Sequence, residues 1–289
     1  MADLYAVIGN PIAHSKSPLI HAAFARQTDQ DIQYEAILAP ADAFGATVSR
    51  FRQRGKGANI TVPFKLEAFS LSTRLTGRAQ VARAVNTLVF ETDGILGDNT
   101  DGAGLVRDIS VNLEFSFKDR RVLLMGAGGA ARGVILPLLE HEPHLLVVAN
   151  RTEQKAHELQ QEFSSHGNIV SADYAGLRGE RFDLVINATS ASLQGELPAL
   201  PSDIFSAGSL AYDMMYGQGS TPFLKFAQQH GAARLADGIG MLVEQAAESF
   251  FLWRKIRPET APVIEMLRAV SASGHISKTG GSTDKSAGA

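Results

Sequence analysis

The glycine-rich segment Arg121 to Gly133 (RVLLMGAGGAARG) contains the clearest functional motif in this sequence. An apolar run, Val122 to Met125, stops at the glycines, and helix-forming residues follow. Gly126, Gly128 and Ala131 occupy the small-residue positions of the motif G-x-G-x-x-G/A. Such a turn between a strand and a helix lets backbone N–H groups approach a pyrophosphate at the helix N-terminus. The segment therefore predicts a dinucleotide-binding site.

The next apolar run, Leu145 to Ala149, ends at Asn150-Arg151-Thr152. The second strand of a Rossmann unit places the residue that contacts the adenosine ribose at this point, and proteins that bind NAD usually carry Asp or Glu there. Arg151, with Lys155 four residues later, suits a 2′-phosphate better than a free hydroxyl. The pattern favours NADP, although either cation alone would be typical of a solvated loop or helix start.

Two pairs of polar side chains in the N-terminal third could contact a substrate. Ser15 and Ser17 precede a helix expected to begin at Pro18, and hydroxyls beside a helix N-terminus can bind a carboxylate. An N-cap role would by itself explain Ser17. Asn59 and Thr61 alternate with apolar residues in a predicted strand, so they share one face of it. Exposure on an edge strand is the alternative explanation for this second pair.

Lys65 and Asp101 are two charged residues that lie where predicted helices begin. Lys65 lies in the first turn of a helix predicted over residues 63–71, directly after the strand 58–62. Open α/β folds bind their ligands at the carboxyl ends of such strands. Asp101 closes a run of four polar residues and could serve as the N-cap of the following helix. The same run suits the lining of a cleft, and we place a domain boundary near residue 101.

These segments require two α/β units to position them. In the first unit we expect helices near residues 18–24, 44–51 and 63–71, with the stretch 55–57 ending the second of them. Its strands are expected at residues 4–8, 34–38 and 58–62, with a hairpin over 86–96. Strands of the second unit are expected at residues 122–125, 145–149, 182–187, 210–214 and 233–236. Their alternation with helices predicts a parallel, doubly wound sheet. Helices are expected at 241–253 and 258–270, with Gln245 exposed by default, and a disordered tail at 271–289.

The composition excludes several classes of protein. The chain has 289 residues, a formal net charge of −3 and no cysteine. A basic face for nucleic acid, a disulfide framework and a thiolate zinc site are therefore not expected, and neither is any other metal site. The sequence has no apolar stretch of membrane-spanning length and no signal-peptide pattern at its N-terminus. We expect a cytoplasmic protein that binds a small-molecule substrate, as a monomer or homodimer.

Several motifs together resemble one family over roughly residues 4 to 270. They are Gly9-Asn10-Pro11, His14 to Pro18, Asn59 to Lys65, Ala84 to Thr87, Gly97 to Gly102, the GAGGA turn, Asn150 to Thr152, Asn187 to Ser190 and Ala236 to Gly238. In this order the chain resembles shikimate dehydrogenase, the NADP-dependent type of the aromatic amino-acid pathway. The resemblance implies reversible reduction of 3-dehydroshikimate to shikimate, a step of chorismate biosynthesis.

The resemblance also implies an architecture and a set of site residues. It implies an N-terminal substrate domain at 1–101, a Rossmann domain at 102–238, and helices at 239–270 that return to the first domain. Lys65 and Asp101 are implied to be the catalytic pair. The residues implied to surround the substrate are Ser15, Ser17, Asn59, Thr61, Lys65, Asn86, Asp101, Tyr216 and Gln245. Those implied to hold NADP are Gly126, Ala127, Gly128, Gly129, Ala130, Asn150, Arg151, Thr152, Lys155, Thr189, Met214 and Gly238.

Two departures from the family pattern concern the cofactor. Lys155 stands where many relatives have Arg, so a point charge replaces a bidentate donor. Ala191-Ser192 stands where relatives often have a glycine, so the loop near the nicotinamide can differ in shape.

Two other functions remain open at this stage. One is a quinate/shikimate dehydrogenase that uses NAD, which Arg151 and Ser17 oppose. The other is a dinucleotide-binding sensor without chemistry, which would not need Lys65 and Asp101.

Overall fold

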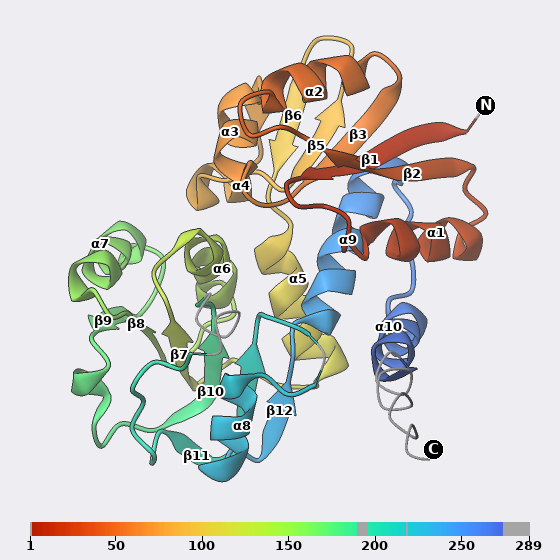
Figure 1. Ribbon diagram of the computed structural model, residues 1–289. Helices are drawn as coiled ribbons and strands as arrows, with labels where there is room; N and C mark the ends of the chain where they lie inside the picture. Colours follow the sequence, from red (N-terminus) through yellow and green to blue (C-terminus); the bar gives the residue numbers. More distant parts are fainter. Residues whose placement is uncertain (1, 190–195, 218, 274–289) are drawn as a thin grey trace, which may run out of the picture.

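The computed structural model describes residues 2–189, 196–217 and 219–273, which form two α/β units, one above the other in Figure 1. Each unit is built on a six-stranded sheet. The first sheet has the strand order β2-β1-β3-β5-β6-β4, and the second has the order β12-β11-β10-β7-β8-β9. The predicted fold class, an α/β substrate unit followed by a Rossmann unit, is confirmed.

The first sheet is mixed. Strands β1, β2 and β3 are parallel, and β5 is antiparallel to both β3 and β6. The interior strand β1 is buried from Tyr5 to Ile8, as its apolar sequence requires. The strands are β1 (Asp3–Gly9), β2 (Ile32–Leu38), β3 (Gly55–Ile60), β4 (Arg74–Leu75), β5 (Thr87–Phe90) and β6 (Ile95–Asp98). Helices α2 (Phe44–Arg52), α3 (Lys65–Leu71) and α4 (Gly77–Ala82) also belong to this unit, and α1 (Ser17–Gln27) follows β1.

The second sheet is parallel throughout, and read from β9 its strand order is that of a Rossmann fold, 3-2-1-4-5-6. Its strands are β7 (Arg121–Met125), β8 (Leu145–Ala149), β9 (Ile169–Ala172), β10 (Phe182–Asn187), β11 (Phe205–Asp213) and β12 (Arg234–Ala236). Its helices are α6 (Gly129–Leu139), α7 (Glu153–Phe163), α8 (Pro222–Gln229) and a short 3-10 helix, η2 (Ala175–Leu177). The sequence prediction found five of these strands and missed β9.

Two helices connect the units. Helix α5 (Asp101–Arg107) continues into a π-helical turn, η1 (Asp108–Asn112), and lies beside α9 (Ile239–Arg254). A Cβ on Gly104 of α5 would lie 2.6 Å from the backbone N of Gln245, so only glycine permits this close approach. The two helices therefore place Asp101 and Gln245 at the same junction between the units.

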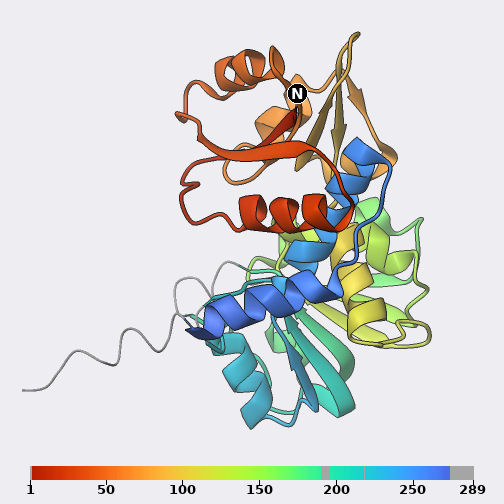
Figure 2. The ribbon, with the colours of Figure 1, turned by 90° about the vertical axis from the view of Figure 1, so that its right-hand side faces the viewer.

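The C-terminal helices return to the first unit, as predicted. Helix α10 (Ala261–Ser273) lies below α1 in both ribbon views (Figures 1 and 2). A buried apolar cluster joins α1, α9 and α10, and it includes Phe24, Phe250 and Ile264. The burial of these faces holds the end of the chain against the N-terminal unit.

Several local predictions were wrong. The stretch 55–57 belongs to β3 and does not terminate the preceding helix, and β3 ends at Ile60, which leaves Thr61 outside the strand. Helix α3 begins at Lys65 and not at residue 63. Ser17 is the first residue of α1 and not its N-cap, because Lys16 occupies the N-cap position. The backbone N–H of Ser17 donates to Ser15 Oγ at 3.3 Å.

The end of the chain also departs from the prediction. Helix α10 extends to Ser273, three residues into the predicted tail, because no helix-breaking glycine or proline follows Val270 before Gly274. Residues 274–289 of that tail lie outside the described residues. The predicted domain limits at residues 101 and 238 stay predictions.

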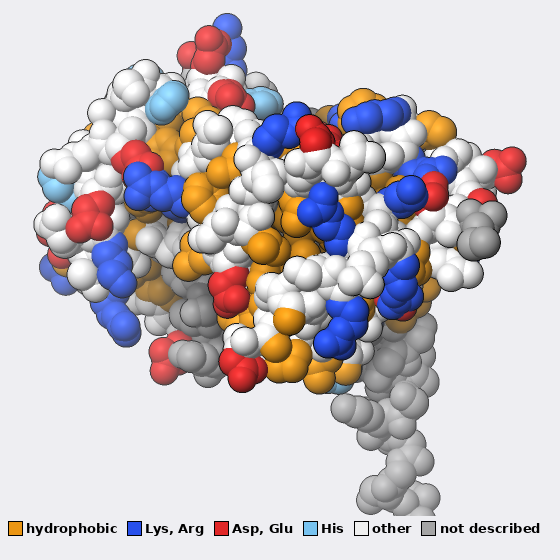
Figure 3. Space-filling model, turned by 90° about the horizontal axis from the view of Figure 1, so that it is seen from above, with side chains coloured by type: hydrophobic (Ala, Val, Ile, Leu, Met, Phe, Trp, Pro, Cys, Tyr) orange, Lys and Arg blue, Asp and Glu red, His pale blue; other side chains and the backbone are white. Residues whose placement is uncertain are grey.

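Charges of both signs are distributed over the face seen from above (Figure 3). On the described part of this face, basic side chains are interspersed with acidic and apolar ones and form no continuous patch. Among the described residues, no helix is both long and apolar enough to cross a membrane.

Candidate active site

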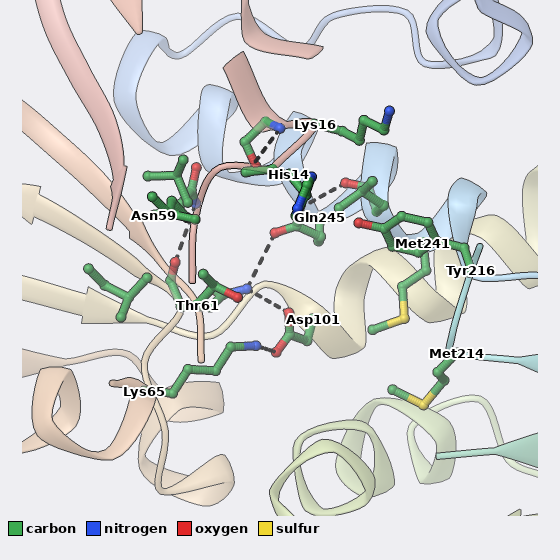
Figure 4. Close-up of a pocket in the computed structure, with 18 of the residues that line it drawn as sticks. His14, Lys16, Asn59, Thr61, Lys65, Asp101, Met214, Tyr216, Met241 and Gln245 are labelled. Atoms are coloured by element: carbon green, nitrogen blue, oxygen red, sulfur yellow. Dashed lines mark hydrogen bonds and ion pairs between the residues drawn. The ribbon is translucent and has the colours of Figure 1, made fainter. Parts of the chain in front are cut away.

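A cavity of about 380 Å³ lies where the two units and α9 meet. All nine residues predicted to surround the substrate line it. In Figure 4, Asn59 and Thr61 of the first unit lie on one side, and Met214 and Tyr216 of the second unit lie on the other. The first unit, the second unit and the C-terminal helix thus each contribute side chains to one site.

Lys65 and Asp101 meet at the edge of this cavity. Lys65 is the first residue of α3 and Asp101 the first residue of α5. Their Nζ and Oδ2 atoms are 2.5 Å apart (Figure 4), and their side chains are 32% and 18% exposed. The predicted N-cap role of Asp101 was wrong: Thr100 occupies the N-cap position, and the Asp101 carboxylate is bound to Lys65 instead.

Asn86 fixes the second oxygen of Asp101. Its Oδ1 accepts from the backbone N–H of Thr100 at 2.9 Å and from the hydroxyl of Thr87 at 2.9 Å. With the carbonyl oxygen so engaged, its Nδ2 donates to Asp101 Oδ1 at 2.8 Å. The carboxylate therefore receives donors on both oxygens. A lysine ammonium has three N–H groups, so Lys65 keeps donors for the cavity.

The hydrogen bonds of Asn59 fix its amide orientation. Tyr34 donates its hydroxyl to Asn59 Oδ1 at 2.7 Å, and Asn59 Nδ2 donates to Ser249 Oγ at 2.9 Å. For the pair Asn59 and Thr61, the alternative was exposure on an edge strand. Asn59 is only 7% exposed, so this alternative does not hold for it.

The residues predicted to hold the dinucleotide follow strands of the second sheet. They lie at the carboxyl ends of β7, β8, β10, β11 and β12, which form one edge because the sheet is parallel. Gly126 has φ of +106°, which only glycine adopts readily, and its N–H donates to Ala149 O at 2.7 Å. A Cβ added to Gly128 or Gly129 would meet no described heavy atom within 4 Å. The backbone at the start of α6 is therefore open to a ligand.

Two further segments complete this edge. Arg151 and Lys155 are exposed, with Arg151 directly after β8 and Lys155 in the first turn of α7. Asn187 at the end of β10 accepts from the hydroxyl of Thr189 at 2.7 Å and donates to buried Asp213 at 3.1 Å. The carboxyl ends of β10 and β11 are thereby joined. The predicted departure at Ala191-Ser192 lies outside the described residues.

Some cavity residues were missed by the sequence prediction. Met241 and Leu242 line the cavity one turn before Gln245 on α9, and Met215, His14 and Lys16 also line it. Helical spacing from Gln245 could have found the first two, since residues three and four apart share a helix face. The default surface position of Gln245 was wrong, because α9 packs between the two units.

The fold and site define a two-unit dehydrogenase, with a Rossmann sheet for a dinucleotide facing a polar pocket that holds a Lys–Asp pair. Three family descriptions match the chain. Residues 7–88 match the shikimate dehydrogenase substrate binding domain, residues 109–194 match shikimate / quinate 5-dehydrogenase, and residues 238–268 match the shikimate 5'-dehydrogenase C-terminal domain.

Curated relatives and solved structures agree with these matches. Shikimate dehydrogenase (NADP(+)) of Nitrosospira multiformis is 75% identical over 93% of this chain and 98% of its own length. An Ael1 enzyme from Pseudomonas putida is 53% identical with a TM-score of 0.89, covering 92% of this chain and 98% of that one. The shikimate 5-dehydrogenase of Thermus thermophilus, in complex with NADP(H) and shikimate, is 30% identical with a TM-score of 0.83, covering 92% and 99%. The chain belongs to the shikimate dehydrogenase family.

Proposed function

We propose that this protein is an NADP-dependent oxidoreductase that reversibly reduces 3-dehydroshikimate to shikimate in chorismate and aromatic amino-acid biosynthesis. The observation that carries the proposal is the Lys65–Asp101 pair at the edge of a cavity lined by seven other predicted substrate residues. A dinucleotide sensor would need neither the pair nor the polar lining.

The residues at the sheet edge fit the dinucleotide. The open backbone at Gly128 and Gly129 suits a pyrophosphate at the N-terminus of α6. Arg151 and Lys155 suit a 2′-phosphate, whereas no acidic residue follows β8 directly to accept a ribose hydroxyl. When bound, the nicotinamide ring supplies or accepts the hydride. Met214 and Gly238, which belong to the predicted cofactor set, also line the substrate cavity.

Lys65 handles the proton in this mechanism. As the substrate carbonyl is reduced, its oxygen gains negative charge, and Lys65 Nζ donates a proton to that oxygen. In the oxidation direction the same nitrogen takes the hydroxyl proton. Asp101 stabilises the charged ammonium and, held by Asn86, keeps Nζ oriented toward the cavity. The pair thereby serves as acid in one direction and base in the other.

The rest of the lining matches the chemistry of shikimate, which carries one carboxylate and several hydroxyls. The hydroxyls of Ser15 and Ser17 lie at the start of α1, so its N-terminus also favours a carboxylate. Thr61 and Gln245 supply neutral donors and acceptors for hydroxyl groups. A pocket built on such hydrogen bonds rejects analogues that lack the hydroxyls.

The test is a rate measurement by NADPH absorbance on the purified full-length chain, with shikimate or quinate as substrate and NADP or NAD as cofactor. Turnover mainly with shikimate and NADP is the expected result. Comparable turnover of quinate with NAD would instead favour the quinate/shikimate branch. No turnover in any of the four combinations, together with measurable NADP binding, would favour a dinucleotide-binding sensor.

A further inference from the structure

Ser249 is a buried serine behind the cavity wall. It lies on α9, one helical turn after Gln245, and it is 0% exposed. It does not line the cavity, and the predicted site residues do not include it. Its hydroxyl nevertheless contacts groups from three separate segments that do shape the site.

The contacts of this hydroxyl are short and well distributed. Asn59 Nδ2 lies 2.9 Å from Ser249 Oγ, and Thr87 Oγ1 lies 2.8 Å from it. Thr100 Oγ1 is 3.3 Å away. Ser249 Oγ itself donates to the backbone carbonyl of Gln245 at 3.0 Å.

A hydroxyl group has one hydrogen and two lone pairs. With its hydrogen directed to Gln245 O, Ser249 accepts from the amide of Asn59. Thr87 gives its own hydrogen to Asn86 Oδ1, so the second acceptor position of Ser249 is left for the hydroxyl of Thr100 at 3.3 Å. All its hydrogen-bonding capacity is thus used. Each of these partners is itself one step from the substrate: Asn59 and Gln245 line the cavity, and Thr87 contacts Asn86 Oδ1 at 2.9 Å.

We propose that Ser249 is a positioning residue for substrate binding, which acts through Asn59 and through the threonine hydroxyls that orient Asn86. This inference rests on the proposed function. Asn59 Oδ1 is engaged by Tyr34, and Ser249 is the nearest of three acceptors for Nδ2, so Ser249 helps to fix the rotation of the amide from its opposite end. The serine thereby couples the C-terminal helix to the substrate-binding strands of the first unit.

Removal of the hydroxyl should loosen this arrangement without touching the reacting groups. In Ser249→Ala, Asn59 Nδ2 keeps only Thr87 Oγ1 at 3.1 Å and Asn86 O at 3.3 Å, and a buried threonine hydroxyl loses a neighbour. Loss of one such buried partner corresponds to about a fivefold to thirtyfold change. Asn59 and Gln245 bind substrate in the ground and transition states alike, so the change should fall on KM for shikimate and leave kcat nearly intact.

A matched control is Ser209 on β11. It is also buried, at 1% exposure, and its Oγ has no hydrogen-bond partner within the described part of the chain. Ser209→Ala therefore removes a buried serine hydroxyl that positions nothing, and its kinetic constants should equal those of the wild type. Ser249→Cys is a second variant of similar size, and its weaker sulfur acceptor should raise KM by less than Ser249→Ala does.

The experiment measures kcat and KM for shikimate and for NADP in the wild type and the three variants. A rise in KM for shikimate in Ser249→Ala, with KM for NADP and the pH profile of kcat unchanged, is the expected result. Wild-type KM values in both Ser249 variants would overturn the inference, as would a parallel rise of KM for both ligands. If Ser249→Ala does not fold, Ser249→Cys alone gives the comparison. An inactive wild type would instead refute the proposed function.

Discussion

Replacement of Lys65 by methionine tests the proton-transfer role most directly. Lys65→Met keeps much of the length of the side chain and removes its charge and donors. Asp101 then loses its partner on Oδ2, while Asn86 still donates to Oδ1 at 2.8 Å. The variant therefore separates the chemistry of the pair from its contribution to stability.

The two effects should differ greatly in size. The Lys65 side chain is 32% exposed and that of Asp101 18%, so water screens their attraction, and the pair should contribute only about 1 kcal/mol to stability. For a chain of this size that is a fall in Tm of roughly 2–4 °C. Loss of a positioned acid/base group lowers kcat by about two to four powers of ten, equivalent to roughly 3–5 kcal/mol of barrier.

The assay is steady-state turnover of shikimate with NADP, alongside thermal denaturation and a measurement of NADP affinity. NADP affinity should change little, since Lys65 is not among the residues predicted to hold the cofactor. Exposed Lys118 provides the control: Lys118→Met should match the wild type in all three measurements. A fall in kcat of less than tenfold in Lys65→Met would refute the assignment of Lys65 as acid and base.

Three further substitutions test other parts of the structure. Burial lowers the pKa of His21 from 6.5 to about 3, so the unfolded chain binds the extra proton between these values and stability rises with pH across this window. His21→Phe keeps an aromatic ring against Tyr34 but removes the titrating group. In urea unfolding, the free energy of unfolding of this variant should therefore rise with pH less steeply than that of the wild type, by about 1.4 kcal/mol per pH unit in this window. Equal slopes in the two proteins would contradict this. Gly126→Ala should cost about 1–3 kcal/mol in the same assay and weaken NADP binding, because φ is +106° and the new Cβ would lie 3.2 Å from Thr189 Cγ2. Wild-type stability and affinity would show that the turn relaxes. Arg151→Glu should raise KM for NADP by about tenfold or more and leave KM for NAD within a few-fold; an equal rise for both would disprove contact with the 2′-phosphate.

The dinucleotide half was predictable from sequence because its signals are local. An apolar strand, a glycine turn and a helix start within the stretch 121–133 determine one unit, and parallel topology then brings the strand ends together. Strand β9 at the edge of the sheet was not predicted, because its four residues, IVSA, are too few to form a clear apolar run. Local motifs alone indicated the glycine turn and the Arg151 position, whereas residues such as Asn86 and Tyr216 were supplied by the family resemblance.

Other features depend on partners far away in the sequence. An N-cap was the reasonable expectation for Asp101, but a lysine from another helix binds its carboxylate. Gln245 and Ser249 lie on a helix whose periodicity identifies its apolar face without saying which segments will cover its polar positions. Several of the hydrogen bonds that orient Asn59 and Asn86 come from residues distant in the chain, so no local sequence pattern predicts these bonds.

The return of α9 and α10 to the first unit has a consequence for protein synthesis. The apolar face of α1 is covered by helices that leave the ribosome after the whole Rossmann unit. At about 5–20 residues per second, the nascent first unit exposes that face for roughly tens of seconds. During this time it also lacks Gln245 and Ser249. The N-terminal unit thus keeps this apolar face uncovered while translation proceeds, and the pocket has no complete lining until α9 has left the ribosome.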